Sequence, residues 1–167
     1  MGEASATARV QAALQTAGLD AEILQFPEST RTAGEAAQAV GADVGQIGKS
    51  LIFTVTDDQG RQAPLLAIVS GRNRADMEKL SRHLGARVKR AGADLVREVT
   101  GFAIGGVPPL GHATKLPVLI DQDLAQYPEL FLAAGTPHAV FRCTFPELVK
   151  ATGGEVVDLC EEVAGSI

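Results

Sequence analysis

The sequence is poor in aromatic residues, which make up 4% of its 167 positions and include no Trp and a single Tyr. A core must therefore be built from Ala, Val, Leu and Ile, and a hydrophobic content of 46% supplies enough of them for one domain. No apolar run approaches the roughly 18 residues of a membrane-spanning helix. The N-terminal MGEASATARVQAAL lacks the pattern of a secretory signal, and Ala6 stands where myristoylation needs Ser or Thr. These absences predict a cytoplasmic protein with no membrane partner.

Cysteine is also scarce, because Cys143 and Cys160 are the only two and no C-x-x-C occurs. This excludes a disulfide framework and a zinc site of ordinary ligand spacing. The three histidines are far apart in the sequence and lack a carboxylate constellation, so we expect no metal and no other cofactor. Both cysteines are predicted to pack in the core. A small-molecule hydrolase that uses Cys143 with His138 remains a distant alternative.

Positive charge is outnumbered, with a net charge of −5, which argues against a protein that coats nucleic acid in general. The charge is nevertheless uneven, because eight of the fifteen basic residues fall in the basic stretch 72–97: Arg72, Arg74, Lys79, Arg82, Arg87, Lys89, Arg90 and Arg97. Such a stretch either binds a polyanion locally or forms a solvated helix face, and the sequence leaves both interpretations open.

Short helices and strands alternate along the chain, and several strand pairs are joined by turns too short for a crossover. Helices are predicted at 10–17, 32–41, 73–84, 93–99 and 144–153, and strands at 22–26, 50–57, 64–70, 86–90, 117–121, 129–135, 139–143 and 155–159. Capping boxes begin the helices at Thr32 and Thr144, and Asn73 is the predicted cap of a third. The pattern favours a single α/β (α+β) domain in which short helices surround a mixed, largely antiparallel, barrel-like sheet.

Lys49 lies in GQIGKSLIF (45–53), at the predicted entry to an apolar strand. A buried lysine is costly without an anion, which makes Lys49 a candidate site residue, although a side chain that reaches water from a strand end is an equal alternative. The string GKS does not make a phosphate-binding P-loop, because Asp43 replaces the required glycine and the lysine precedes a strand instead of a helix. The strand position argues against a Lys49–Ser50 dyad, because neighbouring residues on a strand point to opposite faces.

Two loops rich in glycine and proline are further candidates. GGVPPLGH (105–112) can present backbone N–H and C=O groups to a nucleotide or an ester carbonyl, and AAGTPHAVF (133–141) places Gly135 and His138 in a tight turn between strands. Each loop could instead be a structural turn, and each histidine a surface residue without a role.

Four segments, in this order, resemble the YbaK/ProX family of tRNA-editing proteins, which is related to the editing domain inserted in bacterial prolyl-tRNA synthetase. They are STRTAGEAAQAVG (29–41), GQIGKSLIF (45–53), GGVPPLGH (105–112) and LAAGTPHAVFRC (132–143). The resemblance covers nearly the whole chain and implies one editing domain over residues 1–167. It also implies an enzyme that acts in trans and deacylates mischarged aminoacyl-tRNA, removing a small amino acid from the 3′ end.

The resemblance assigns roles to the candidate residues. Lys49 would be the catalytic residue and would hold the terminal nucleotide or the ester carbonyl. The two loops would bind substrate, the first by contacting the terminal adenosine and the second as the variable wall that sets amino-acid choice. The substrate-binding residues so implied are Gly105, Gly106, Pro108, Pro109, Gly111, His112, Gly135 and His138.

An aminoacyl ester is already activated, so a ribose hydroxyl of the substrate and a positioned water suffice for hydrolysis. The expected partner is the 3′ acceptor end of aminoacyl-tRNA, with an aminoacyl-tRNA synthetase as a second partner to consider, and the expected assembly is a monomer or a homodimer. Steric exclusion would reject a larger cognate amino acid. The basic stretch 72–97 would touch the acceptor stem. The alternative is a non-catalytic tRNA- or nucleotide-binding module on the same fold.

Overall fold

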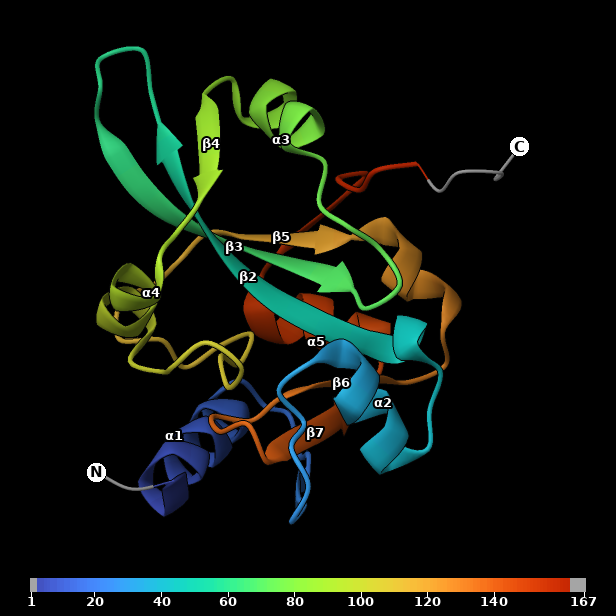
Figure 1. The fold of residues 1–167 in the computed structure, drawn as a ribbon. Coiled ribbons are helices and arrows are strands. Elements are labelled where there is room, and N and C mark those ends of the chain that lie inside the picture. The colour runs from blue at the N-terminus through green and yellow to red at the C-terminus, as the bar shows by residue number, and fades with distance from the viewer. Residues whose placement is uncertain (1–2, 163–167) are drawn as a thin grey trace.

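The computed structural model describes residues 3–162 and shows, within them, a mixed sheet of eight strands and five α-helices (Figure 1). The helices are α1 (Glu3–Thr16), α2 (Ala33–Val40), α3 (Met77–Leu84), α4 (Ala93–Thr100) and α5 (Phe145–Thr152), with short 3-10 helices η1 (Val44–Gln46) and η2 (Gln122–Gln126). The strands are β1 (Ile23–Gln25), β2 (Ile47–Thr56), β3 (Gln62–Ser70), β4 (Arg87–Arg90), β5 (Val118–Asp121), β6 (Leu130–Ala133), β7 (Ala139–Cys143) and β8 (Glu155–Val157). None of these helices is long and apolar enough to cross a bilayer.

The strand order is β1-β7-β6-β2-β3-β5-β8, and β4 forms an additional pair with β2. Four pairings are antiparallel (β1–β7, β6–β7, β2–β3 and β2–β4), and three are parallel (β2–β6, β3–β5 and β5–β8). β1 and β8 lie at opposite ends of the order, so the curved sheet stays open. The predicted fold class, a mixed and largely antiparallel sheet with short helices around it, is confirmed.

β2 and β3 form the long hairpin at the centre of the sheet, in register from Gly48 opposite Ser70 to Thr56 opposite Gln62. The predicted hairpin is therefore confirmed, but β2 begins at Ile47 and not at the predicted position 50. Gly48 and Lys49 continue the pairing with β3, and Ile47 is added by a parallel pairing with Phe131 of β6, a contact between distant segments that local patterning cannot reveal. Lys49 consequently lies inside the strand.

Local signals located most helix ends correctly. Thr32 with Glu35, and Thr144 with Glu147, form complete capping boxes, and Gly41 and Gly153 end the two helices in the left-handed conformation. The predicted cap at Asn73 is wrong. Helix α3 begins three residues later, where the Asp76 side chain accepts hydrogen bonds from backbone amides of the first turn.

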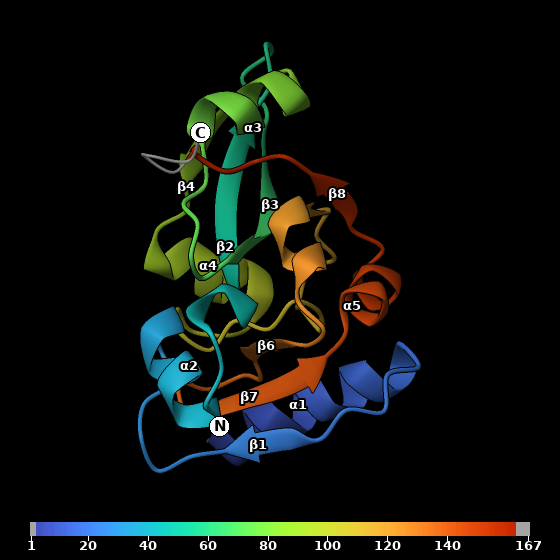
Figure 2. The same ribbon diagram turned by 90° about the vertical axis from the view of Figure 1, so that its right-hand side faces the viewer.

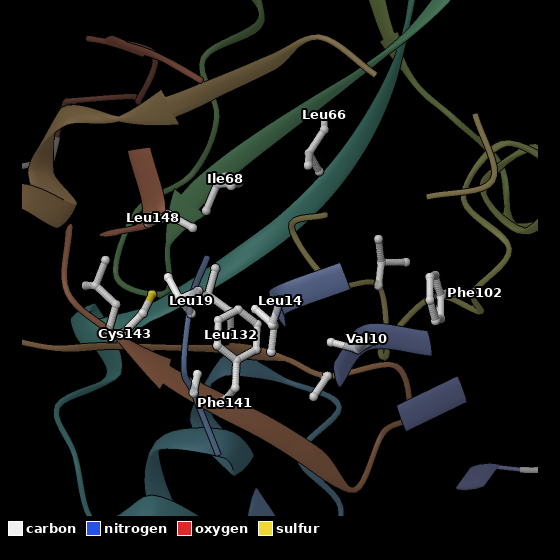
Figure 3. Close-up of a cluster of buried hydrophobic side chains, with 14 of the residues drawn as sticks. Val10, Leu14, Leu19, Leu66, Ile68, Phe102, Leu132, Phe141, Cys143 and Leu148 are labelled. Carbon is white, nitrogen blue, oxygen red and sulfur yellow. The ribbon is translucent and has the colours of Figure 1, made fainter. Parts of the chain in front are cut away.

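Side chains of β2 and β3 alternate between two buried clusters, one on each face of the hairpin. The larger cluster includes Ile52, Leu66 and Ile68, and the smaller one includes Phe53 and Val69. Figure 3 shows side chains of the larger cluster converging from α1 (Val10, Leu14), β3 (Leu66, Ile68), β7 (Phe141) and α5 (Leu148). Figure 2 shows α1 and α5 beside the β1, β6 and β7 end of the sheet, while α3 lies at the far end of the hairpin.

Candidate functional site

A cavity of about 380 Å³ lies along the outer edge of β2. β6 pairs with this edge only at residues 47–48, and β4 only at residues 53–56. Between these two pairings, residues 49–52 line the cavity. On the β4 side of this segment, the structure shows one backbone hydrogen bond, which the Ala91 amide donates to the Ile52 carbonyl. The site thus occupies a break in strand pairing, where backbone groups are available to a ligand.

The wall of this cavity is mostly apolar and comes from distant parts of the chain. The apolar and glycine members are Ala33, Ala36, Ile47, Gly48, Leu51, Ile52, Ala91, Val96, Ile104, Gly105, Val107, Phe131, Leu132, Ala133 and Val140. The polar members are Thr30, Arg31, Thr32, Lys49, Ser50 and Arg90. An apolar pocket of this size with a few polar groups is typical of a site for a small ligand or for one end of a larger one.

Lys49 is half-buried, lines the cavity and pairs across the hairpin with Val69, so its side chain leaves β2 on the face of the smaller cluster. Its Nζ donates a hydrogen bond of 2.6 Å to the Asn73 carbonyl oxygen, and Asn73 lies outside the cavity wall. Burial lowers the pKa of Lys49, and the nearby Arg90 and Arg74 act in the same direction. The ammonium is therefore held against a backbone carbonyl beside the cavity, and no carboxylate forms a salt bridge with it in the described part of the chain.

Gly105 joins Lys49 on the wall of the cavity. Its φ of +96° is unfavourable for other residues, and a Cβ there would lie 2.6 Å from Cγ of Arg31. The next residue, Gly106, packs so closely on the second loop that a Cβ would lie 2.8 Å from the Thr136 backbone, and its carbonyl accepts the Gly135 amide at 2.9 Å. The two predicted loops therefore meet through their backbones.

The turn that contains Gly135 and His138 supports the cavity from behind and is absent from its wall. The His138 imidazole bonds the Glu28 carbonyl at 2.9 Å through Nδ1, and the Pro137 carbonyl accepts the Thr30 amide at 2.7 Å. These bonds attach the segment before α2 to the turn after β6. The structure therefore places the turn where it sets the position of wall residue Thr30.

From Pro108 onward the first loop lies outside the cavity wall. Pro108 and Pro109 are buried, and the exposed Gly111 packs against Ala13 of α1. The His112 imidazole is bonded through Nε2 to the Pro108 carbonyl at 2.7 Å, and burial lowers its pKa, so the ring is neutral at neutral pH. These four predicted substrate-binding residues lie outside the cavity wall, in contrast to Lys49 and Gly105.

Two hydroxyls on the wall were not predicted to be site residues, because the sequence did not distinguish Thr30 and the Lys49–Ser50 dyad was rejected. The Oγ1 of Thr30 and the Oγ of Ser50 are buried, and neither has a hydrogen-bond partner among the residues that the structure describes. Buried hydroxyls are normally paired, and an unpaired one costs about 1–3 kcal/mol. The only sequence signal for Thr30 was its place at the start of the first family-like segment. Both hydroxyls are free to pair with a polar ligand.

Arg31 and Arg90 place two exposed guanidinium groups at the cavity. Neither forms a salt bridge within residues 3–162, whereas Arg72 and Lys79 of the basic stretch are paired with Asp43 and Asp158. Arg90 lies over the Phe53 ring, 5.6 Å from its centroid. Sequence reasoning included Arg90 only in the basic stretch and missed Arg31, because the packing of residue 31 on Gly105 is a tertiary contact.

The structure gives no support to thiol or metal chemistry in its described residues. Burial raises the pKa of Cys143 to about 12, so the thiol stays protonated at neutral pH, and the His138 ring is engaged by Glu28. Cys143 packs in the larger cluster, as predicted. Between residues 3 and 162, no group of three or more His, Cys, Asp or Glu side chains is arranged to hold a metal ion.

Comparison with known proteins connects this cavity to a family. The model of the aminoacyl-tRNA editing domain matches residues 27–151, which contain every segment of the cavity wall. The uncharacterized protein YwhH of Bacillus subtilis (strain 168) is 29% identical over 84% of this chain and 88% of its own length. The multifunctional Ser/Thr-tRNA deacylase ProXp-y of Escherichia coli (strain K12) is 32% identical over 57% of this chain and 58% of its own.

A solved structure agrees with these matches. The crystal structure of a candidate trans-editing enzyme for prolyl-tRNA synthetase superposes with a TM-score of 0.86 and 51% identity, over 94% of this chain and 98% of that one. The family model covers well over half of the sequence, so the editing family inferred from the four segments is confirmed. The chain belongs to the aminoacyl-tRNA editing domain family.

Proposed function

We propose that this protein hydrolyses mischarged aminoacyl-tRNA in trans, releasing a small amino acid from the 3′ end. One observation carries the proposal: the cavity along β2 has Lys49 and Gly105 on its wall and two guanidinium groups beside it. An apolar recess with cationic groups suits an acylated nucleotide, whose phosphate is anionic and whose aminoacyl group is small. Membership of the editing family supports the same assignment.

The reaction needs little from the protein beyond positioning. A water oxygen attacks the ester carbonyl carbon, the bond from that carbon to the ribose oxygen breaks, and the ribose oxygen takes up the proton that the water loses. The products are the free amino acid and the unacylated tRNA. Lys49 would hold the terminal nucleotide or stabilise the charge on the carbonyl oxygen, and the neighbouring ribose hydroxyl would orient the water.

Cavity size would set the choice of amino acid. The wall includes Phe131, Ile47 and Val140, whose side chains restrict the space that remains once a ribose has entered. One methylene changes binding in an apolar pocket by only about 1–3 kcal/mol, so rejection of a bulky cognate residue by steric exclusion is more effective than attraction of a small one.

A panel of tRNAs mischarged with Ala, Ser, Cys or Thr tests the proposal directly. We expect multiple turnovers under excess substrate on at least one small aminoacyl ester, and slow hydrolysis of correctly charged tRNA with a bulky amino acid. Tight tRNA binding without turnover on any member of the panel would favour the alternative, a non-catalytic binding module.

The two arginines give a prediction about affinity. We expect Arg31→Ala and Arg90→Ala each to raise KM for aminoacyl-tRNA several-fold with little change in kcat, because exposed guanidinium groups contact phosphates and not the reacting ester. Each loss should also reduce the slope of log KM against log salt by about 0.7 per single-strand phosphate contact.

The matched control is Arg61→Ala, because Arg61 is an exposed arginine whose salt bridge with Asp57 lies at the turn of the β2–β3 hairpin. It should leave KM and the salt slope unchanged. Equal effects from all three variants would mean that net charge matters and that the two cavity arginines are not a specific contact.

The unpaired hydroxyls give a prediction with opposite signs for stability and activity. Ser50→Ala and Thr30→Val each remove a buried hydroxyl that bonds no group within residues 3–162, so we expect the free energy of unfolding to stay equal or to rise by up to about 1 kcal/mol. Deacylation should fall about five-fold or more if these hydroxyls pair with the substrate. Thermal unfolding and single-turnover hydrolysis measure the two effects, and higher stability with unchanged rates on the whole panel would remove both hydroxyls from the site.

A further inference from the structure

A buried polar cluster formed by Asn73 and Asp121 lies next to the Lys49 ammonium, where β3 and β5 end. Asp121, the last residue of β5, is 1% exposed, and Asn73, in the loop after β3, is 7% exposed. Oδ2 of Asp121 accepts hydrogen bonds from the Ser70 amide at 3.0 Å and from Nδ2 of Asn73 at 2.9 Å. Its Oδ1 accepts the Asp123 amide at 2.9 Å. A buried carboxylate with no salt bridge in the described chain is thus satisfied by three donors.

Asn73 connects this carboxylate to the lysine. Its Nδ2 also donates to Oδ2 of Asp123 at 2.8 Å, and its backbone amide bonds the Ser70 carbonyl at 2.9 Å. Its own carbonyl oxygen accepts the Lys49 ammonium at 2.6 Å. The residue is held by its side chain and its amide, which leaves its carbonyl in a defined place to hold Lys49.

The fold has no evident need for so polar an arrangement at this point. A loop between a strand and a helix can be closed by capping alone, and Asp76 already caps α3. A buried carboxylate and amide destabilise the folded state unless every polar group is hydrogen-bonded, and a fully hydrogen-bonded network is rigid. A long lysine side chain gains most from a rigid acceptor, because its many rotamers would otherwise spread the ammonium over several positions.

We propose that Asn73 and Asp121 are positioning residues for Lys49 in the deacylation reaction, with Asp121 fixing Asn73 and the Asn73 carbonyl fixing the ammonium at the cavity. This proposal rests on the proposed function for its effect on the rate. The link from Asp121 to Lys49 can be tested without any substrate.

The pKa of Lys49, which depends on the charged groups around it, distinguishes a positioning role of Asp121 from a purely structural one. Asp121 from β5 and Cys160 from the C-terminal segment oppose the lowering of the Lys49 pKa by burial, while Arg90 from β4 and Arg74 from the loop after β3 add to it. Burial raises the pKa of Cys160, so its thiol is neutral at neutral pH. Asp121 acts to raise the pKa of Lys49, so we expect a neutral residue at position 121 to lower that pKa further.

Asp121→Asn is the first test, because it keeps the shape and an acceptor for the Ser70 amide. We expect kcat to fall about ten-fold while KM stays within two-fold of the wild-type value, because the ammonium would no longer be held in place for the reaction. The alkaline limb of the kcat profile should also move to lower pH, because the ammonium loses its proton earlier when Asp121 no longer acts to raise the pKa of Lys49. Asn73→Ala should give a similar loss of kcat with a smaller movement of that limb, since Asp121 keeps its charge.

The control is Asp158→Asn. Asp158 is an exposed acid that pairs with Lys79 and is not among the groups that act on Lys49. It should leave kcat, KM and the pH profile unchanged. Thermal unfolding of each variant separates a global loss of stability from a local effect.

A titration of Lys49 decides the proposal independently of activity. Reductive methylation with 13C-formaldehyde labels the lysines, and the Lys49 signal is the one that Lys49→Ala removes. We expect this signal to titrate at lower pH in Asp121→Asn than in the wild type and to broaden or shift in Asn73→Ala. A signal that is identical in all three proteins would overturn the proposal, whatever the rates. A wild type that titrates as expected but hydrolyses nothing would instead overturn the proposed function.

Discussion

Lys49→Ala is expected to lower kcat/KM for deacylation by about 10²–10³-fold while the fold survives. This is the loss typical of removing one group that stabilises developing charge on a carbonyl oxygen. The free energy of unfolding should hardly change. Burial already disfavours the charged form of Lys49, as its lowered pKa shows, and loss of its hydrogen bond to the Asn73 carbonyl leaves no other side chain unpaired. Single-turnover hydrolysis of a mischarged tRNA, with thermal unfolding alongside, measures both effects.

Lys49→Arg is the matched variant for this experiment. Arginine keeps the charge but replaces a compact ammonium by a planar fork that does not fit the single acceptor at Asn73, so we expect it to rescue tRNA affinity more than the rate. Hydrolysis at the wild-type rate by the alanine variant would end the assignment of Lys49. Loss of both affinity and rate in the alanine variant, with affinity alone restored by arginine, would show that the charge binds and the geometry catalyses.

Gly105→Ala is expected to have the second-largest effect, a loss of about ten-fold or more in kcat/KM. A side chain at φ +96° is strained by about 1–2 kcal/mol, and the new Cβ would lie 2.6 Å from Cγ of Arg31. Either the Gly105 loop or Arg31 must then move, and both line the cavity. We expect the rate and the affinity to fall together, measured as kcat and KM on the same substrate.

Gly60→Ala is the control that separates the effect of backbone strain from a direct effect on the cavity. Gly60 lies in the turn of the β2–β3 hairpin with φ +78°, and a Cβ there meets nothing within 4 Å. It should lose a similar free energy of unfolding, about 1–2 kcal/mol, and keep its activity. If both variants lost activity equally, the effect of Gly105 would be one of stability and the loop would not belong to the site.

Local chemistry explains which parts of the fold were predictable. The capping boxes at Thr32 and Thr144 and the glycine stops at Gly41 and Gly153 act within one turn of helix, so their sequence signature is complete. The prediction failed at Asn73, which has a good capping side chain that is used elsewhere. Its partners are Asp121 and Asp123, some fifty residues away in sequence, and no local pattern reports them.

The residues of the site likewise divide into those with a local sequence signal and those without one. Lys49 and Gly105 could be singled out because a charged residue in an apolar strand and a glycine in a proline-rich loop are locally unusual. Arg31, Thr30 and Ser50 are locally ordinary. They become notable only when the segment before α2 packs on the Gly105 loop and when β6 and β4 leave a gap along β2.

The class of fold, the elements with local start and stop signals, the central hairpin and the family could all be predicted from the amino-acid sequence. These follow from hydrophobic periodicity, from capping and turn residues, and from motifs whose spacing is written in the chain. Three features required the three-dimensional fold: the first residue of β2, the loop residues that reach the cavity, and the hydrogen bonds that link Lys49 to Asn73 and Asn73 to Asp121. The physical reason is that strand pairing and buried polar networks join residues far apart in the chain, and their energies depend on distances that no local pattern encodes.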